Sequence, residues 1–226
     1  INDQFFTMDG LVSDEGSIKK KIYDKLRPWY ASGLPKKVSG LMDCLRIECY
    51  SRPLPTQLDR IHVANGTYFL DGRFTPDKEF CLNRLPVRYN PDAPKPEKWL
   101  EFLNDLLIPE DILTLQEYLG YCLIPSTKAQ KMLFLIGKGG EGKSRIGVVM
   151  RSIFGGNMKT GSLFKVEENR FARADLEYAL LMVDDDLKLE ALPQINVIKS
   201  IVTAELPMDL EKKCKQSYQG RLYVRF

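Results

Sequence analysis

The sequence has 226 residues, of which 44% are hydrophobic and 28% charged, proportions typical of a soluble protein with a substantial core. The formal net charge is only +3, so bulk charge does not indicate nucleic-acid binding, and any such contact would need a local basic patch. No apolar run approaches the roughly 18 residues that span a bilayer and no signal-peptide pattern opens the chain, so we expect no membrane partner. Five cysteines without a C-x-x-C pair and a single histidine argue against a zinc site. Because the chain begins with Ile1 rather than Met, we expect a fragment or a processed product.

The first 60 residues are predicted to be mainly helical. Apolar residues at helical spacing predict one helix over 17–30 and a second over 38–50. Pro28 should end or kink the first helix near Arg27, because proline lacks the backbone N–H that a helix interior needs.

From Arg60 the pattern changes to short strands. Residues 61–64 and 67–70 flank an Asn-Gly pair, which is a strong β-hairpin signal. Residues 85–89 predict an edge strand, since a proline within a strand is tolerated only at an edge.

A proline-rich connector at 90–96 marks the expected module boundary. Apolar stripes then predict helices over 97–107 and 111–123, most simply as core-packing faces. A buried strand is expected over 131–136 and a further helix over 145–154.

Between that strand and that helix lies a complete phosphate-binding loop of the form G-x-x-x-x-G-K-S, residues 137–144. Its glycines allow a tight turn in which backbone N–H groups point at phosphate oxygens, and the helix that follows would present its N-terminus to them. Lys143 would reach the β- and γ-phosphates of ATP, and the Ser144 hydroxyl would hold Mg²⁺. The alternative, a glycine-rich turn with an incidental lysine, is disfavoured by the strand–loop–helix setting. The residues predicted to bind the nucleotide are Gly137, Gly139, Gly140, Glu141, Gly142, Lys143 and Ser144.

A phosphate-binding loop also needs a carboxylate at the end of a neighbouring strand to hold Mg²⁺ and to polarise the attacking water. The apolar run 179–183 ends in Asp184, Asp185 and Asp186, and Asp184 follows Lys143 by 41 residues. We predict that Asp184 and Asp185 are functional and that Asp186 is peripheral. The pattern does not decide which acid serves the metal and which the water, and a solvated acidic turn is the alternative interpretation.

Together these segments resemble superfamily 3 helicases, and more narrowly the helicase part of primase–helicases from phages, plasmids, poxviruses and mobile chromosomal cassettes. The resemblance covers residues 60–226 well and residues 1–60 only loosely. It rests on the phosphate-binding loop, the acidic strand end and the flanking segments 85–93, 115–121 and 130–137.

The resemblance implies an α/β fold in three parts. A P-loop NTPase core, of the AAA+-like superfamily 3 type, would cover 129–226 and be incomplete at its C-terminal end. A helical segment over 96–128 would lead into it, after an N-terminal accessory module over 1–95 made of helices and then a small β-hairpin.

The implied function is an ATP-dependent DNA helicase or translocase of a mobile-element replication protein, with ATP and Mg²⁺ as cofactors. Its partners would be single-stranded DNA or a DNA fork, further copies of itself in a homo-hexamer, and a primase domain or protein, in the cytoplasm of a bacterial host. Lys143, Asp184 and Asp185 would be catalytic, and Ser144 with Asp185 would hold the metal. The family's γ-phosphate-sensing asparagine and arginine finger would lie beyond Phe226.

The family also has a hairpin that touches DNA inside the ring, and the stretch 209–218 matches it. Lys212, Lys213 and Lys215 would contact the DNA phosphates there, whereas without the resemblance a solvated turn would be preferred. Two other function classes stay open from the sequence: a small-molecule kinase, and a non-hydrolysing ATP-binding module for assembly or loading.

Overall fold

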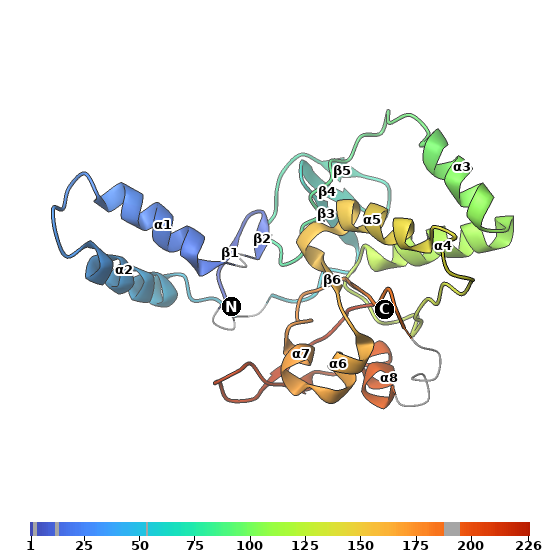
Figure 1. Ribbon diagram of the computed structural model, residues 1–226. Helices are drawn as coiled ribbons and strands as arrows, with labels where there is room; N and C mark the ends of the chain where they lie inside the picture. Colours follow the sequence, from blue (N-terminus) through green and yellow to red (C-terminus); the bar gives the residue numbers. More distant parts are fainter. Residues whose placement is uncertain (2–3, 12–13, 53, 188–194) are drawn as a thin grey trace. The chain divides into compact units, whose positions relative to one another are not determined.

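The computed structural model (Figure 1) describes residues 1, 4–11, 14–52, 54–187 and 195–226. The chain divides into two compact units, the first formed by residues 1–55 with 80–82 and the second by residues 56–79 with 83–226. Within the described residues, no helix is both long enough and apolar enough to cross a membrane. The three-part division predicted from the sequence stays a prediction.

The first unit contains an antiparallel pair of helices, α1 (Glu15–Leu26) and α2 (Leu34–Glu48). Two short antiparallel strands precede them, β1 (Phe6–Thr7) and β2 (Gly10–Leu11). The predicted helices are therefore confirmed, but α2 begins four residues earlier than expected. Gly33 adopts a left-handed conformation with φ of +71° just before it, and a proline follows in the first turn, where its missing N–H has no helical partner to lose.

The second unit opens with a three-stranded antiparallel sheet of β3 (Arg60–Val63), β4 (Gly66–Phe69) and β5 (Phe74–Thr75). The predicted β3–β4 hairpin is confirmed. Gly66 has a φ of +155°, and a Cβ there would lie 2.0 Å from the Thr75 carbonyl oxygen, so the position requires glycine.

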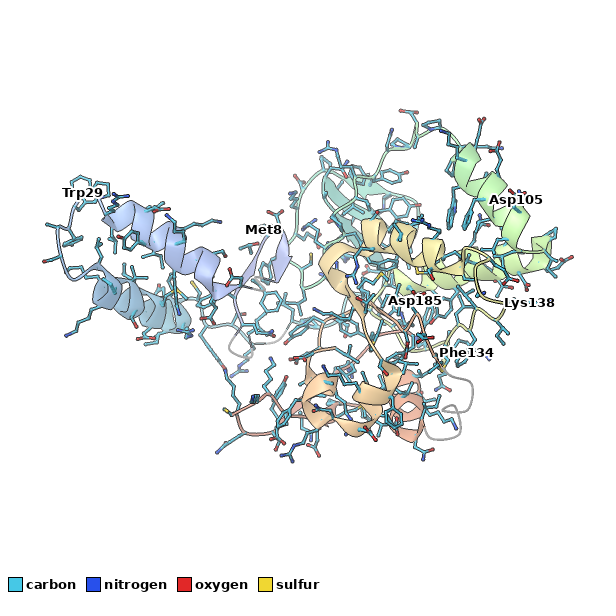
Figure 2. The ribbon with its side chains drawn as sticks, viewed as in Figure 1. Met8, Trp29, Asp105, Phe134, Lys138 and Asp185 are labelled. Carbon is cyan, nitrogen blue, oxygen red and sulfur yellow. The ribbon has the colours of Figure 1, made fainter. Side chains whose placement is uncertain are left out.

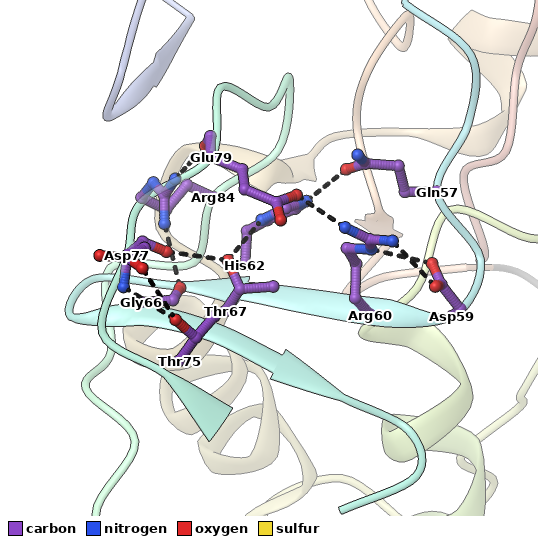
Figure 3. A network of polar contacts seen from close by, with 10 residues as sticks. All are labelled: Gln57, Asp59, Arg60, His62, Gly66, Thr67, Thr75, Asp77, Glu79 and Arg84. Atoms are coloured by element: carbon purple, nitrogen blue, oxygen red, sulfur yellow. Dashed lines mark hydrogen bonds and ion pairs between the residues drawn. The ribbon is translucent and has the colours of Figure 1, made fainter. Parts of the chain in front are cut away.

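A buried polar network fixes this sheet to the chain that follows it (Figure 3). Arg84, which is buried, donates to the carbonyl oxygens of Val63 and Gly66. His62 shares hydrogen bonds with Thr67 and Gln57 on its two ring nitrogens. These contacts satisfy polar groups that would otherwise be costly to bury.

The predicted edge strand over 85–89 is wrong. Backbone bonds run from Leu85 N–H to His62 C=O and from Ala64 N–H to Val87 C=O, so the segment follows β3. Pro86 lies between these two residues and has no N–H to donate, so the segment does not form a regular strand.

The rest of the second unit alternates helices with short strands (Figure 1). The predicted helices before and after the phosphate-binding loop are confirmed. The elements in chain order are α3 (Glu97–Leu106), α4 (Pro109–Cys122), α5 (Lys143–Phe154), the 3-10 turn η1 (Gly155–Asn157), β6 (Met158–Thr160), α6 (Leu163–Glu168), α7 (Arg170–Ala174), β7 (Leu181–Val183), α8 (Asn196–Val202), β8 (Met208–Leu210) and β9 (Tyr218–Gly220).

Strand β7 lies between two hydrophobic clusters. Leu181 packs into a cluster built mainly from α3, α4 and α5, whereas its neighbour Met182 packs into one built from α6, α8 and the β8–β9 hairpin. Because successive strand residues point to opposite faces, β7 has helices on both sides. Strand β6 pairs with it in parallel, and Arg225 bridges to Leu181 on its other edge.

The predicted strand over 131–136 is also wrong. Leu133 N–H donates to Phe226 C=O, but the segment makes no regular ladder, and Ile136 is 77% exposed. A strand needs continuous backbone pairing with a neighbour, which an apolar run by itself does not supply.

Candidate functional site

Helix α5 begins at Lys143, directly after the glycine-rich loop. Gly140 and Gly142 have φ of +86° and +95°, values that only glycine adopts without strain. At Gly137 a Cβ would come within 2.2 Å of Glu141 Oε2, so a larger residue there would displace the Glu141 side chain. The loop therefore has the tight turn expected from the sequence, and no side chain caps the first N–H groups of the helix.

The Lys143 side chain lies over this loop. Its ammonium donates to the Lys138 carbonyl oxygen at 2.7 Å and pairs with Glu141 Oε2 at 2.9 Å. The ammonium is thus held between a neutral oxygen and an anionic oxygen, which is the chemistry that a phosphate group offers. The sequence did not indicate that Glu141 is the partner of Lys143.

Ser144 and Asp185 are in direct contact. The Ser144 hydroxyl donates to Asp185 Oδ1 at 2.8 Å, joining the first turn of α5 to the acids that follow β7 across 41 residues of sequence. The structure therefore brings together the two residues that the sequence proposed as metal ligands.

Asp184 has a different environment from Asp185. Its Oδ2 accepts the Leu163 N–H at the start of α6 at 2.8 Å, and its Oδ1 accepts the Asp186 N–H at 3.2 Å. Asp184 is therefore fixed by backbone donors, whereas Asp185 is exposed and Asp186 serves mainly to close the turn.

A cavity of about 290 Å³ lies between the loop and the acids. Lys143, Ser144 and the three aspartates form its polar side, and Leu133, Phe134 and Phe226 are among its apolar lining residues. Figure 2 labels Phe134, Lys138 and Asp185 around this region. A mainly apolar pocket with a few convergent polar groups is the usual form of a ligand site, and this volume lies near the lower end of the usual range.

The stretch predicted to contact DNA forms the β8–β9 hairpin, in which Leu210 pairs with Tyr218. Its three lysines are not equivalent. Lys213 and Lys215 are exposed in the connecting loop, whereas Lys212 is 20% exposed and pairs with Glu177 Oε2 at 3.2 Å.

Glu177 was missed by the sequence analysis. Its side chain is 2% exposed, and besides Lys212 it accepts the Tyr218 hydroxyl at 2.6 Å. Burial, followed by this hydrogen bond and the negative charge of Glu177, raises the pKa of Tyr218. An acid just before a strand carries no local signal of such a role, because its partners lie 35 and 41 residues further on.

Arg225 was missed as well. Its guanidinium is buried and donates to the carbonyl oxygens of Ser126, Tyr121 and Cys122, at and just beyond the C-terminal end of α4. A cation there offsets the partial negative charge of the helix end. Arg170 and Arg173, both on α7, are engaged within the chain: Arg170 pairs with Glu211, and Arg173 donates to the Val166 carbonyl oxygen.

Two known families match separate parts of the chain. Residues 135–226 match a family of unknown function, DUF5906, and residues 11–108 match a family described as D5 N terminal like. No curated protein matches the chain. The D5 N-terminal domain is the N-terminal part of phage- and poxvirus-type primase–helicase proteins, and this match fits a replication protein.

Proposed function

We propose that this chain carries the P-loop ATPase core of a DNA helicase or translocase, in a replication protein of a mobile genetic element. The observation that carries the proposal is the 2.8 Å contact between Ser144 and Asp185 beside Lys143. This contact joins a hydroxyl at a helix N-terminus to a carboxylate at a strand end. The two residues are 41 positions apart in the sequence, so only the fold brings them together.

The order of backbone neighbours supports the proposal. Strand β6 pairs with β7, Arg225 bridges to β7 on the other side, and the neighbouring Phe226 accepts from Leu133, which precedes the loop. The phosphate-binding loop follows the segment that contains Leu133, and the acids follow β7. Ligand sites of α/β proteins lie at the carboxyl ends of parallel strands.

The residues present fit ATP and Mg²⁺. Hydroxyl and carboxylate oxygens are the hard ligands that Mg²⁺ prefers, and Ser144 and Asp185 would hold the ion. When bound, ATP would supply the phosphoanhydride bond whose hydrolysis drives movement. Lys143 would exchange Glu141 for phosphate oxygens, and Asp184, held by two backbone donors, would orient the attacking water.

The β8–β9 hairpin is the proposed DNA-contacting element. Lys213 and Lys215, both exposed, would contact the phosphates of single-stranded DNA, and Lys212 would hold the hairpin in place through Glu177. Full activity would need a ring of six copies in which a neighbour supplies an arginine, together with a primase, in the bacterial cytoplasm. The D5 N terminal like match supports the assignment to replication.

Measuring ATP binding and ATP turnover separately, with and without single-stranded DNA, tests the proposal. We expect Lys143→Ala to abolish binding, and Lys213→Ala with Lys215→Ala to abolish DNA stimulation while ATP binding is retained. The charge-matched control is Lys95→Ala with Lys98→Ala, which replaces two exposed lysines near the start of α3. It should change neither ATP binding nor the stimulation of turnover by DNA. Phosphate transfer to a small molecule without DNA stimulation would indicate a kinase, and binding without turnover would indicate an assembly module.

A further inference from the structure

The segment that runs along α1, through the connecting loop and into the first half of α2 forms a strongly basic surface. Residues 16–42 contain seven cations, at positions 19–21, 25, 27, 36 and 37, and one acid, Asp24. All seven cations are exposed, and Asp24 pairs with Lys20. The segment carries a net charge of +6 in a chain whose total is +3, so the positive charge is concentrated here. We call this segment the basic tip.

Helix stability accounts for the cations at the C-terminal end of α1, Lys25 and Arg27, but not for those in α2. Lys36 and Lys37 lie in the first turn of α2, which contains no acid, although the N-terminal end of a helix already carries partial positive charge. Each of the two ammonium groups is repelled by this partial positive charge, which destabilises the helix by a few tenths of a kcal/mol per lysine. Their positive potential adds to that of the uncapped N–H groups of the same turn. The two lysines and the uncapped N–H groups together would attract an anion from solution to the first turn of α2.

Aromatic side chains lie among these cations. Trp29 is 80% exposed and Tyr30 42% exposed in the connecting loop. Figure 2 shows Trp29 in this loop, directed away from the two helices. The Lys37 ammonium lies 4.2 Å from the centre of the Tyr30 ring, which links the loop to the first turn of α2. Exposed aromatic rings beside cations are the elements with which proteins stack unpaired bases and neutralise phosphates.

The helix faces argue against a lipid surface as the partner. A membrane-surface helix needs an exposed apolar face. Ile18, Ile22 and Leu26, the apolar residues of α1, are partly buried, and α1 packs against α2. The basic tip therefore offers cations and two rings, but no continuous apolar stripe.

We infer that the basic tip is a binding site for single-stranded nucleic acid, separate from the ATP site and from the β8–β9 hairpin. Trp29 stacks on a base, and Lys36 and Lys37 contact the phosphates that flank it. The inference does not depend on the proposed ATPase activity, because it rests on residues of the first unit alone.

Tryptophan fluorescence tests this inference directly. Trp29 and Trp99 are the two tryptophans of the chain, so Trp99→Phe leaves Trp29 as the single reporter. Titration of the full chain with an oligothymidylate, without nucleotide, should quench this emission. Variants that lack Trp29 are followed by the anisotropy of a labelled oligothymidylate: Trp29→Ala should weaken binding about tenfold, as expected for the loss of one stacked base, and Trp29→Phe should restore most of it. Tyr50→Ala removes an aromatic side chain that is 76% exposed beyond the other end of α2, and it is the matched control.

Salt dependence tests the phosphate contacts. Lys36→Ala with Lys37→Ala should reduce the slope of log affinity against log salt by about 1.4, since each phosphate contact with a single strand contributes about 0.7. Lys95→Ala with Lys98→Ala should leave the slope unchanged. Repeating the titration with Lys143→Ala and with Lys213→Ala plus Lys215→Ala should leave the quenching intact, which separates this site from the proposed function.

Three outcomes would overturn the inference. Absence of quenching, or an oligothymidylate affinity of Trp29→Ala equal to that of the parent, would show that Trp29 does not stack on a base. Equal affinity for duplex DNA would exclude single-strand recognition. Equal affinity for poly-glutamate, with the same dependence on Trp29, would indicate an acidic protein as the partner.

Discussion

Replacing Glu177 by Gln should destabilise the β8–β9 hairpin strongly, because its buried carboxylate binds both Tyr218 and Lys212. It accepts the Tyr218 hydroxyl at 2.6 Å and pairs with Lys212 at 3.2 Å. Glutamine keeps the shape and one acceptor oxygen but loses the charge. Hydrogen bonds to charged groups contribute about 1.5–3 kcal/mol, and removing one member of a buried ion pair costs about 3–5 kcal/mol. Since the Lys212 side chain is 20% exposed and regains some hydration, we expect a loss of about 2–3 kcal/mol.

Urea unfolding of Glu177→Gln, Lys212→Met and the double variant measures this loss. A domain of this size loses about 2–4 °C in Tm per kcal/mol, so the Glu177→Gln variant should melt about 4–12 °C lower. The double variant should be less destabilised than the sum of the two single variants, because it removes the uncompensated ammonium together with its partner. Tyr218→Phe removes the hydrogen bond to the charged carboxylate and should cost about 1.5–3 kcal/mol. Additive losses, or a Glu177→Gln variant within 0.5 kcal/mol of the parent, would refute the reasoning.

Two further predictions concern pH and nucleotide affinity. Burial, and secondarily the positive charge of Arg84, lowers the pKa of His62 from 6.5 to about 4. The unfolded chain therefore takes up a proton first as pH falls, and stability should decrease between about pH 6.5 and pH 4, by at most about 1.4 kcal/mol per pH unit. Urea unfolding at pH 7, 6 and 5 should show this slope, and His62→Gln should flatten it, whereas an unchanged slope would assign the effect to other groups. Glu141→Gln frees Lys143 from its partner and should raise ATP affinity about two- to fivefold by calorimetry, with Glu101→Gln as the exposed control. Weaker binding would show instead that Glu141 contributes to holding the nucleotide.

Sequence reasoning succeeded where the signal is contained in a few neighbouring residues. The Asn-Gly pair predicted the β3–β4 hairpin, and apolar spacing predicted helices α1 to α5 but not the shorter α6, α7 and α8. The positive φ values of Gly140 and Gly142 agree with the turn that the loop pattern requires. It failed for the strands over 85–89 and 131–136, because a strand depends on continuous pairing with residues far away in the chain.

The sequence by itself predicted the glycine-rich turn, helix α5 to within two residues of its start, and the acidic end of β7, since glycine conformation, helix periodicity and apolar runs act over short distances. Only the tertiary structure decided which residues meet. In the folded chain Ser144 donates to Asp185, Asp184 accepts the N–H of Leu163 at the start of α6, and Lys212 forms an ion pair with Glu177. Each of these contacts spans at least 21 residues, and each depends on how strands and helices pack around β7. Packing is a property of the whole core, so no local motif reveals these partners.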